Sequence, residues 1–222
     1  MKQLGKLIGY WGLVALLSAC RECPPDEIIG DAYLTSATKR IVFFTDETVT
    51  YRNATGGQMR LRPGRNLMND TLRFVPIAST CESGWFDQSS IGLYAPSSRA
   101  TYGNDSIRII LEANIGGIEQ PNPYDTVLVD VLSVDFFNRA TNRSAGYFSI
   151  PVSLRNNDLG ILNSDSFFWI TPYRLLPDTT LLGVPLTDAH FAENEFNGGE
   201  VFITAEQGLA AFQIDSVLWV QD

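Results

Sequence analysis

The feature that most constrains this chain is an alternation of apolar and polar side chains with a period of two residues. In the stretch SIRIILEAN (106–114), Ile107, Ile109 and Leu111 fall on one face of an extended strand, while the other face is mostly polar. The spacing of 3.6 residues that is typical of amphipathic helices hardly occurs. We therefore expect the fold to be built from strands.

Similar segments recur along the chain, separated by turn-forming residues. Further strands are expected at 40–45, 48–53, 58–62, 71–75, 146–152, 180–186, 200–205, 209–214 and 216–220. Turns are expected at 53–57, 62–66, 103–106, 120–125, 155–160 and 196–200. The pattern predicts an all-β fold, either an antiparallel β-sandwich or a half-open β-barrel meander, with at most one short helix, expected at 187–196.

The segment DTVLVDVLSVDFF (125–137) is apolar on both faces, which predicts a strand that is covered on both sides and runs through the centre of the domain. It also carries Asp130 and Asp135, which could be imagined as a pair of glycosidase carboxylates. Because their positions in the chain differ by an odd number, we expect them on opposite faces unless a bulge intervenes.

The first nineteen residues have the organisation of a secretory signal peptide. Lys2 and Lys6 precede an apolar stretch from 7 to 17, and small residues follow it. The stretch is too short for a stable membrane span. We expect residues 1–19 to be removed.

Residues 17–20, LSAC, resemble the lipobox of bacterial lipoproteins, and this resemblance implies that Cys20 carries the lipid. The alternatives are a signal peptide cut after Ala19 with an ordinary cysteine at 20, or a C-x-x-C centre formed with Cys23. Several acyl chains would hold a folded domain at a bilayer. We expect a lipidated anchor and linker at 20–30 and a single β-rich domain at 31–222. The expected location is the cell envelope, at the outer membrane; whether the protein lies on the periplasmic or the outer face is left open.

With Cys20 acylated, Cys23 and Cys81 would be the remaining thiols. In an oxidising compartment we expect them to form a disulfide, which would stabilise the fold by about 4 kcal/mol. The alternative is two buried or free thiols.

The net charge argues against one class of partner, and the composition shows that the chain can bury a core. Loss of Lys2 and Lys6 takes the formal net charge from −9 to −11, which argues against a nucleic-acid partner. A hydrophobic content of 45% in 222 residues is sufficient for a large core.

One cationic patch stands out in this acidic chain. Arg52, Arg60, Arg62 and Arg65 cluster on a predicted hairpin and could contact a phosphate or carboxylate group of a glycan or a lipid. The alternative is that these arginines only discourage edge-to-edge pairing of the hairpin.

The single histidine, His190, has acidic neighbours at Asp188, Glu193 and Glu195. These residues could form a metal site, but a solvated acidic segment is the simpler interpretation. We expect no metal, no cofactor and no enzymatic activity.

A recurring triplet, Asp-(Ser/Thr)-apolar, indicates turns that lead into strands. Its copies begin at Asp70, Asp105, Asp125 and Asp215, with near variants at Asp165 and Asp178.

Two segments, YRNATGGQMRL (51–61) and EVFITAEQGLAAFQIDSVLWV (200–220), resemble uncharacterised lipoproteins of the Bacteroidota envelope. The matching positions are Tyr51, Asn53, Gly56, Phe202, Gly208, Leu209, Phe212 and Trp219. The resemblance implies secretion and lipid anchoring and supplies no catalytic residue. It also implies O-glycosylation within the triplets, at Thr71, Ser106, Thr126 or Ser216.

We therefore expect a lipid-anchored, non-catalytic interaction or ligand-binding module. Its expected partners are a membrane, through the N-terminal lipid, and an unknown protein, glycan or lipid. The alternative is a carrier of an apolar, lipid-like ligand in a half-open barrel. The aromatic residues that suggest it are Phe136, Phe137, Phe148, Phe167, Phe168 and Trp169.

Overall fold

A computed structural model describes residues 24–64, 67–83, 87–118, 127–141, 143–154, 173–194 and 199–222. In this part of the chain there are thirteen strands and one short helix. Their bounds are β1 Glu27–Asp31, α2 Ser36–Val42, β2 Val49–Arg52, β3 Gln58–Pro63, β4 Leu67–Ser83, β5 Asp87–Gly103, β6 Ile107–Ile118, β7 Val127–Asn138, β8 Arg143–Leu154, β9 Tyr173–Leu181, β10 Val184–Asn194, β11 Gly199–Thr204, β12 Gly208–Ile214 and β13 Val217–Gln221.

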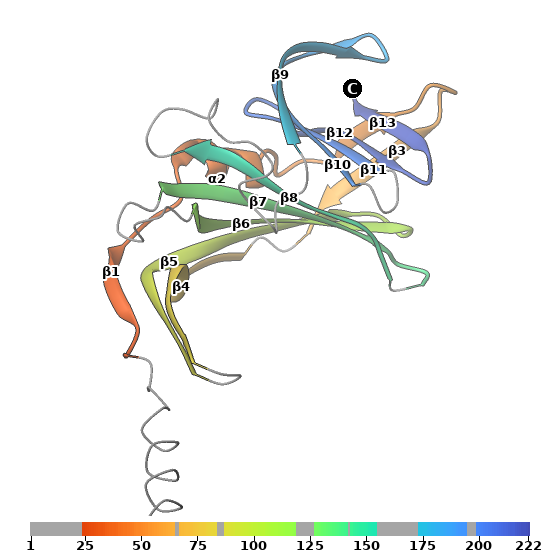
Figure 1. The fold of residues 1–222 in the computed structure, drawn as a ribbon. Coiled ribbons are helices and arrows are strands. Elements are labelled where there is room, and N and C mark those ends of the chain that lie inside the picture. Colours follow the sequence, from red (N-terminus) through yellow and green to blue (C-terminus); the bar gives the residue numbers. More distant parts are fainter. Residues whose placement is uncertain are drawn as a thin grey trace, which may run out of the picture.

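The strands form one strongly curved sheet in the order β8-β7-β6-β5-β3-β2-β13-β12-β11-β10-β9 (Figure 1). The first strand of this path, β8, approaches the last but one, β10: Asn194 on β10 donates from Nδ2 to the carbonyl oxygen of Tyr147 on β8 at 3.0 Å. The result is a nearly closed barrel, which confirms the prediction of an all-β fold. Two strands leave the path: β4 pairs antiparallel with β5, and β1 pairs with β5 in parallel.

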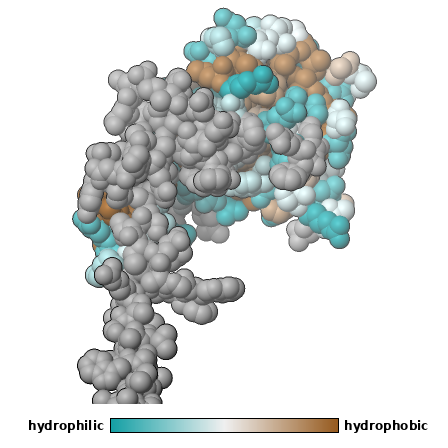
Figure 2. Space-filling view, in the orientation of Figure 1, coloured by the Kyte–Doolittle hydropathy of each residue, from teal (hydrophilic) through white to brown (hydrophobic). Residues whose placement is uncertain are grey.

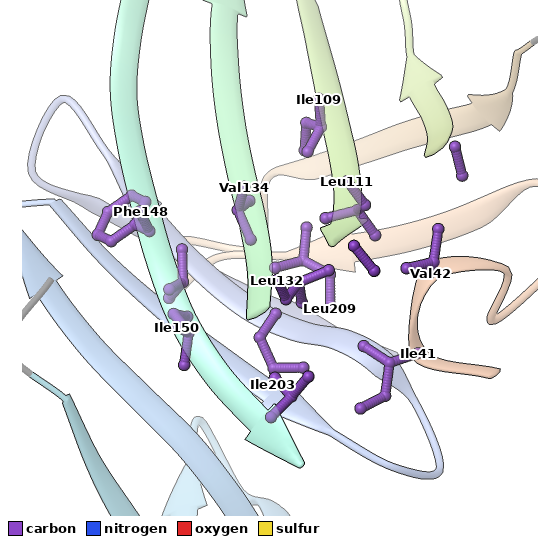
Figure 3. Close-up of a cluster of buried hydrophobic side chains, with 14 of the residues drawn as sticks. Ile41, Val42, Ile109, Leu111, Leu132, Val134, Phe148, Ile150, Ile203 and Leu209 are labelled. Atoms are coloured by element: carbon purple, nitrogen blue, oxygen red, sulfur yellow. The ribbon is translucent and has the colours of Figure 1, made fainter. Parts of the chain in front are cut away.

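Side chains fill the interior of the barrel. Large aliphatic residues from β6, β7, β8, β11 and β12 meet there (Figure 3). The Phe212 ring lies 5.0 Å from that of Tyr51 and 5.3 Å from that of Phe136, and all three residues are fully buried. Tyr51 donates its hydroxyl hydrogen to the Leu209 carbonyl oxygen at 2.7 Å, so the polar group in this core is satisfied.

The helix α2 packs on the inner side of the sheet through Ile41 and Val42 (Figure 3). Its N-cap is Thr35, whose Oγ1 accepts from the Thr38 amide at 3.2 Å. The prediction of a strand at 40–45 is therefore wrong. β-branched and aromatic residues suggested a strand, but capping and burial against the barrel favour a helix there.

The predicted helix at 187–196 is also wrong, because β10 occupies Val184–Asn194. The predicted strand at 180–186 is broken by a turn at Leu182 and Gly183, and both residues have positive φ. This turn joins β9 to β10. Long hydrogen-bonded ladders with β9 and β11 override the local helical preference of this segment.

A second, smaller apolar cluster lies on the other side of β10–β13 from the barrel core. It joins Leu186, Ala189 and Phe191 of β10 to Phe202 of β11 and Val220 of β13. Apolar side chains, interspersed with polar ones, gather at the top of the molecule, where Figure 1 places β9 (Figure 2).

The doubly apolar segment forms β7, between β6 and β8. Leu132, Val134 and Phe136 are fully buried in the barrel core, and on the opposite face Val129 and Val131 are buried as well. Within the described residues, no helix has the length and apolar character that crossing a bilayer would require.

Candidate functional site

A cleft of about 710 Å³ lies on the outer surface of the barrel. Strands β2 and β3, the β5–β6 turn and the residue that follows β7 contribute to it. Its lining residues are Thr48, Thr50, Arg60, Arg62, Gly103, Asn104, Asp105 and Arg139. We call this cavity the arginine cleft.

Strand alternation aims the β2–β3 side chains into the cleft. Tyr51 and Leu61 are buried in the barrel core, so their neighbours Thr50, Arg60 and Arg62 face outward. Thr50 and Arg60 are paired across the two strands. The hairpin therefore presents a hydroxyl and two guanidinium groups on one surface.

The β5–β6 turn forms another wall. Asn104 Oδ1 accepts from the amides of Ser106 and Ile107, each at 2.9 Å, and Asn104 Nδ2 donates to the Arg60 carbonyl oxygen at 3.3 Å. The turn is thereby tied to β3. A Cβ at Gly103 would lie 2.7 Å from the Ile107 carbonyl oxygen, so only glycine fits this point of the wall without a shift.

Arg139 comes to the cleft from the far end of β7. Its amide donates to the Ser106 carbonyl oxygen at 2.9 Å, which holds the β7–β8 turn against the β5–β6 turn. The Nη2 atom of Arg139 lies 3.5 Å from the position that a Cβ on Gly103 would occupy. The third guanidinium group thus stands beside the β5–β6 turn.

The cleft carries a concentrated positive charge. Arg60, Arg62 and Arg139 face one carboxylate, that of Asp105, and none of the three forms an ion pair with a described residue. A guanidinium group keeps its charge and offers several donors in a plane. These groups can therefore bind an anion with several oxygen atoms, such as a phosphate, a sulfate or a carboxylate.

The structure divides the arginines of the predicted patch. Arg60 and Arg62 lie together in the cleft. Arg52 instead forms an ion pair with Asp222, with 2.9 Å between Nε and Oδ1, and contacts the Leu182 carbonyl oxygen at 3.4 Å. Arg65 lies outside the described residues. Arg139, which the sequence did not single out, takes part because the strand register brings it there.

Asp130 and Asp135 lie on opposite faces of β7, which confirms that they share no cleft. Asp130 is fully buried and accepts from the Thr35 amide at 2.8 Å and the Thr38 hydroxyl at 2.7 Å. Asp135 faces outward and accepts from Ser144 Oγ at 3.0 Å. Its partial burial raises the pKa of its carboxyl group, against the lowering effects of Ser144 and nearby arginines.

His190 lies in a strand and is 8% exposed. Burial lowers the pKa of its imidazole, although Asp188 acts in the opposite direction. Its Nδ1 has no hydrogen-bond partner among the described residues. No group of three or more potential metal ligands occurs in the described part of the chain, and Glu195 lies outside it.

The predicted modification sites are described only in part. Cys20, Cys23 and Thr126 lie outside the described residues, and the side chains of Cys81 and Thr71 are not described. The lipid and the disulfide therefore stay predictions.

Ser106 and Ser216 are exposed in the turns before β6 and β13. Two other triplets do not precede a strand, because Asp70 and Asp178 lie inside β4 and β9. The turn interpretation is wrong for those two copies.

No protein-family model, no curated protein and no solved structure matches the chain.

Proposed function

We propose that this protein is a non-catalytic binding module that is anchored to a membrane by a lipid on Cys20 and takes an anionic ligand into the arginine cleft. The single observation that carries the proposal is the set of three guanidinium groups in one cavity, brought there by separate elements and not neutralised by described residues. Because an arginine side chain does not lose its proton in proteins, these groups suit binding and charge neutralisation better than acid–base catalysis.

The shape of the cleft also supports this function. A volume of about 710 Å³ lies within the usual range for small-molecule sites. The hydroxyls of Thr48 and Thr50 and the Asn104 turn add polar groups to its wall. The rest of the protein is acidic, so the positive charge is localised at this surface.

The alternative, a carrier of an apolar ligand inside the barrel, gains no support from the described residues. Tyr51, Phe136, Phe148 and Phe212 are fully buried and pack against neighbouring side chains. The helix α2 adds Ile41 and Val42 to the same core. The described interior is occupied by the protein's own side chains.

Calorimetric titration of the purified protein with inorganic phosphate, sulfate and citrate at low ionic strength tests the proposal. We expect binding of at least one of these anions, weakened by salt, and a loss of about tenfold or more in affinity for Arg62→Gln and for Arg139→Gln. The matched control is Arg40→Gln, which removes one exposed arginine on α2, away from the cleft. Equal losses in all three variants, or no binding of any of these anions, would contradict the proposal.

The anchor is proposed on the strength of the lipobox. The strand β1 begins at Glu27, seven residues after Cys20, so an extended chain reaches at most about 25 Å from the lipid to this strand. Two apolar side chains on β1, Ile28 and Ile29, are each about half exposed. A lipid on Cys20 would therefore bring both side chains within reach of the bilayer surface.

Metabolic labelling with palmitate tests the anchor. We expect the lipid label on the protein and its loss in Cys20→Ser, with Cys81→Ser as the control that keeps it. A label that persists in Cys20→Ser would contradict the proposed attachment.

A further inference from the structure

A second, smaller depression, of about 280 Å³, lies on the outer surface of β5–β8. Its lining includes Arg99, Glu112, Asn114, Asp135, Phe137 and Tyr147. These residues alternate along their strands with side chains of the barrel core, so they all face outward. This depression combines aromatic rings with hydrogen-bond donors and acceptors, whereas guanidinium groups dominate the lining of the arginine cleft.

The aromatic ring of Tyr147 is both exposed and held in place. The residue is 50% exposed, and its hydroxyl shares a 3.0 Å hydrogen bond with Ser133 Oγ. The backbone of Tyr147 is tied to β10 by the bond from Asn194. An exposed, preorganised ring loses little conformational freedom when it stacks against a ligand, and its electron-rich face suits the polarised C–H groups of a sugar ring.

Polar side chains on the neighbouring strands lie close to this ring. Asp135 is the direct cross-strand neighbour of Tyr147, and Ser144 holds its carboxylate by the 3.0 Å bond. Glu112 lies opposite both Ser133 and Arg99 on the neighbouring strands. Carboxylates accept and guanidinium groups donate, so together they match vicinal sugar hydroxyls, which do both.

The depression and the arginine cleft are neighbours on one surface. A cross-strand row runs from Arg62 on β3 through Gly103 on β5 and Arg108 on β6 to Phe137 on β7. With strands about 4.8 Å apart, the backbones at the two ends of this row are about 14 Å apart. The Arg108 guanidinium lies 4.7 Å from the centre of the Phe137 ring, so this row carries a further cation beside the depression.

We propose that the two cavities form one extended site for an acidic glycan. The acidic group of the glycan lies in the arginine cleft, and a sugar ring further along the same glycan stacks on Tyr147, with its hydroxyls bonded to Asp135 and Glu112. This inference rests on the proposed function, since it names the class of ligand that the anion site takes.

Affinity measurements with matched saccharides test the inference. The probes are trigalacturonate, a sulfated galactan trisaccharide, a neutral galactan trisaccharide and inorganic sulfate. We expect at least one acidic trisaccharide to bind at least tenfold more tightly than both the neutral trisaccharide and inorganic sulfate. Tyr147→Ala is expected to weaken binding of that trisaccharide by about tenfold and to leave sulfate binding unchanged, whereas Arg62→Gln weakens both.

Two controls separate stacking from loss of structure. Tyr147→Phe keeps the ring and should bind the acidic trisaccharide within about threefold of the wild type, and Tyr33→Ala removes an exposed ring elsewhere and should have no effect. Acidic trisaccharides that bind no more tightly than sulfate, or that are unaffected by Tyr147→Ala, would overturn the inference while leaving the anion site in place. A protein that binds none of the acidic probes would overturn the anion site as well.

Discussion

Asp130 and Thr38 are fully buried and joined by a hydrogen bond of 2.7 Å, although ninety-two positions separate them in the chain. The same carboxylate oxygen of Asp130 accepts from the amide of Thr35, the N-cap of α2. A carboxylate on β7 therefore holds the first turn of α2 against the inner side of the barrel. Both elements depend on this contact, because a buried polar group without a partner is costly.

Replacing Asp130 or Thr38 should destabilise the fold, and the loss should be larger for Asp130. Asp130→Ala leaves the Thr35 amide and the Thr38 hydroxyl without this acceptor, and we expect a loss of about 2–4 kcal/mol in the free energy of unfolding. Thr38→Val removes one of the two bonds and should cost about 1–2 kcal/mol. Urea unfolding followed by circular dichroism measures both. Two variants within about 0.5 kcal/mol of the wild type would contradict a structural role for the pair.

This contact also shows what the sequence could and could not predict. The period-two pattern predicted most strands and the opposite faces of Asp130 and Asp135, because alternation is a local property of the chain. It did not predict α2, whose residues Ile41 and Val42 are β-branched. The helix depends on an N-cap at Thr35 and on burial against strands that are far away in the sequence.

Tyr51→Phe should destabilise the barrel core. The substitution removes a buried hydroxyl that donates to the Leu209 carbonyl oxygen at 2.7 Å and leaves that carbonyl without this partner. Burial raises the pKa of Tyr51 far above its usual value, so the hydroxyl stays protonated at any ordinary pH. We expect a loss of about 1–2 kcal/mol in the free energy of unfolding.

The matched control is Tyr147→Phe, which removes a hydroxyl at the surface that bonds to Ser133. We expect a change below about 0.5 kcal/mol in the same measurement, because water replaces the lost bond. Similar losses in the two variants would be incompatible with a special role for the buried hydroxyl of Tyr51.

The turn between β12 and β13 stores conformational strain that a single substitution should relieve. Asp215 and Ser216 have φ values of 51° and 62°, in the left-handed region. A two-residue hairpin of this kind favours glycine at its second position. Ser216→Gly should therefore raise the free energy of unfolding by about 0.5 kcal/mol.

The reverse change at the β9–β10 turn is the control. Gly183 has a φ of 83°, and a Cβ added there would meet no other atom within 4 Å, so Gly183→Ala tests backbone strain alone. We expect a loss of about 1 kcal/mol in thermal or urea unfolding. A stability change of the same sign in both variants would speak against this account of the two turns.

The sequence predicted only part of the candidate site, because the rest of it depends on which strands pair. Arg60 and Arg62 alternate along one strand, so the sequence alone places them on one face. Arg139 follows β7, more than seventy residues later, and its place beside them depends on the pairing of β3, β5, β6 and β7. The neutralisation of Arg52 by Asp222 depends on the pairing of β13 with β2 in the same way.

Protonation of His190 should make the protein less stable below neutral pH. Burial lowers the pKa of the folded-state imidazole below its ordinary value of about 6.5, so as the pH falls the unfolded chain takes up a proton before the folded one does. The unfolded state then binds more protons, and the free energy of unfolding falls by at most about 1.4 kcal/mol per pH unit below pH 6.5. Asp188 opposes part of this shift.

The comparison of wild type with His190→Leu isolates this contribution. Urea unfolding at pH 7.5 and 5.5 should show a larger loss of stability on acidification in the wild type than in the variant. Asp135 and Glu200, whose carboxyl pKa values are raised, favour the folded state as the pH falls, but they are present in both proteins and cancel in the difference. Equal pH dependence in the two proteins would mean that His190 titrates alike in the folded and unfolded states, contrary to its burial.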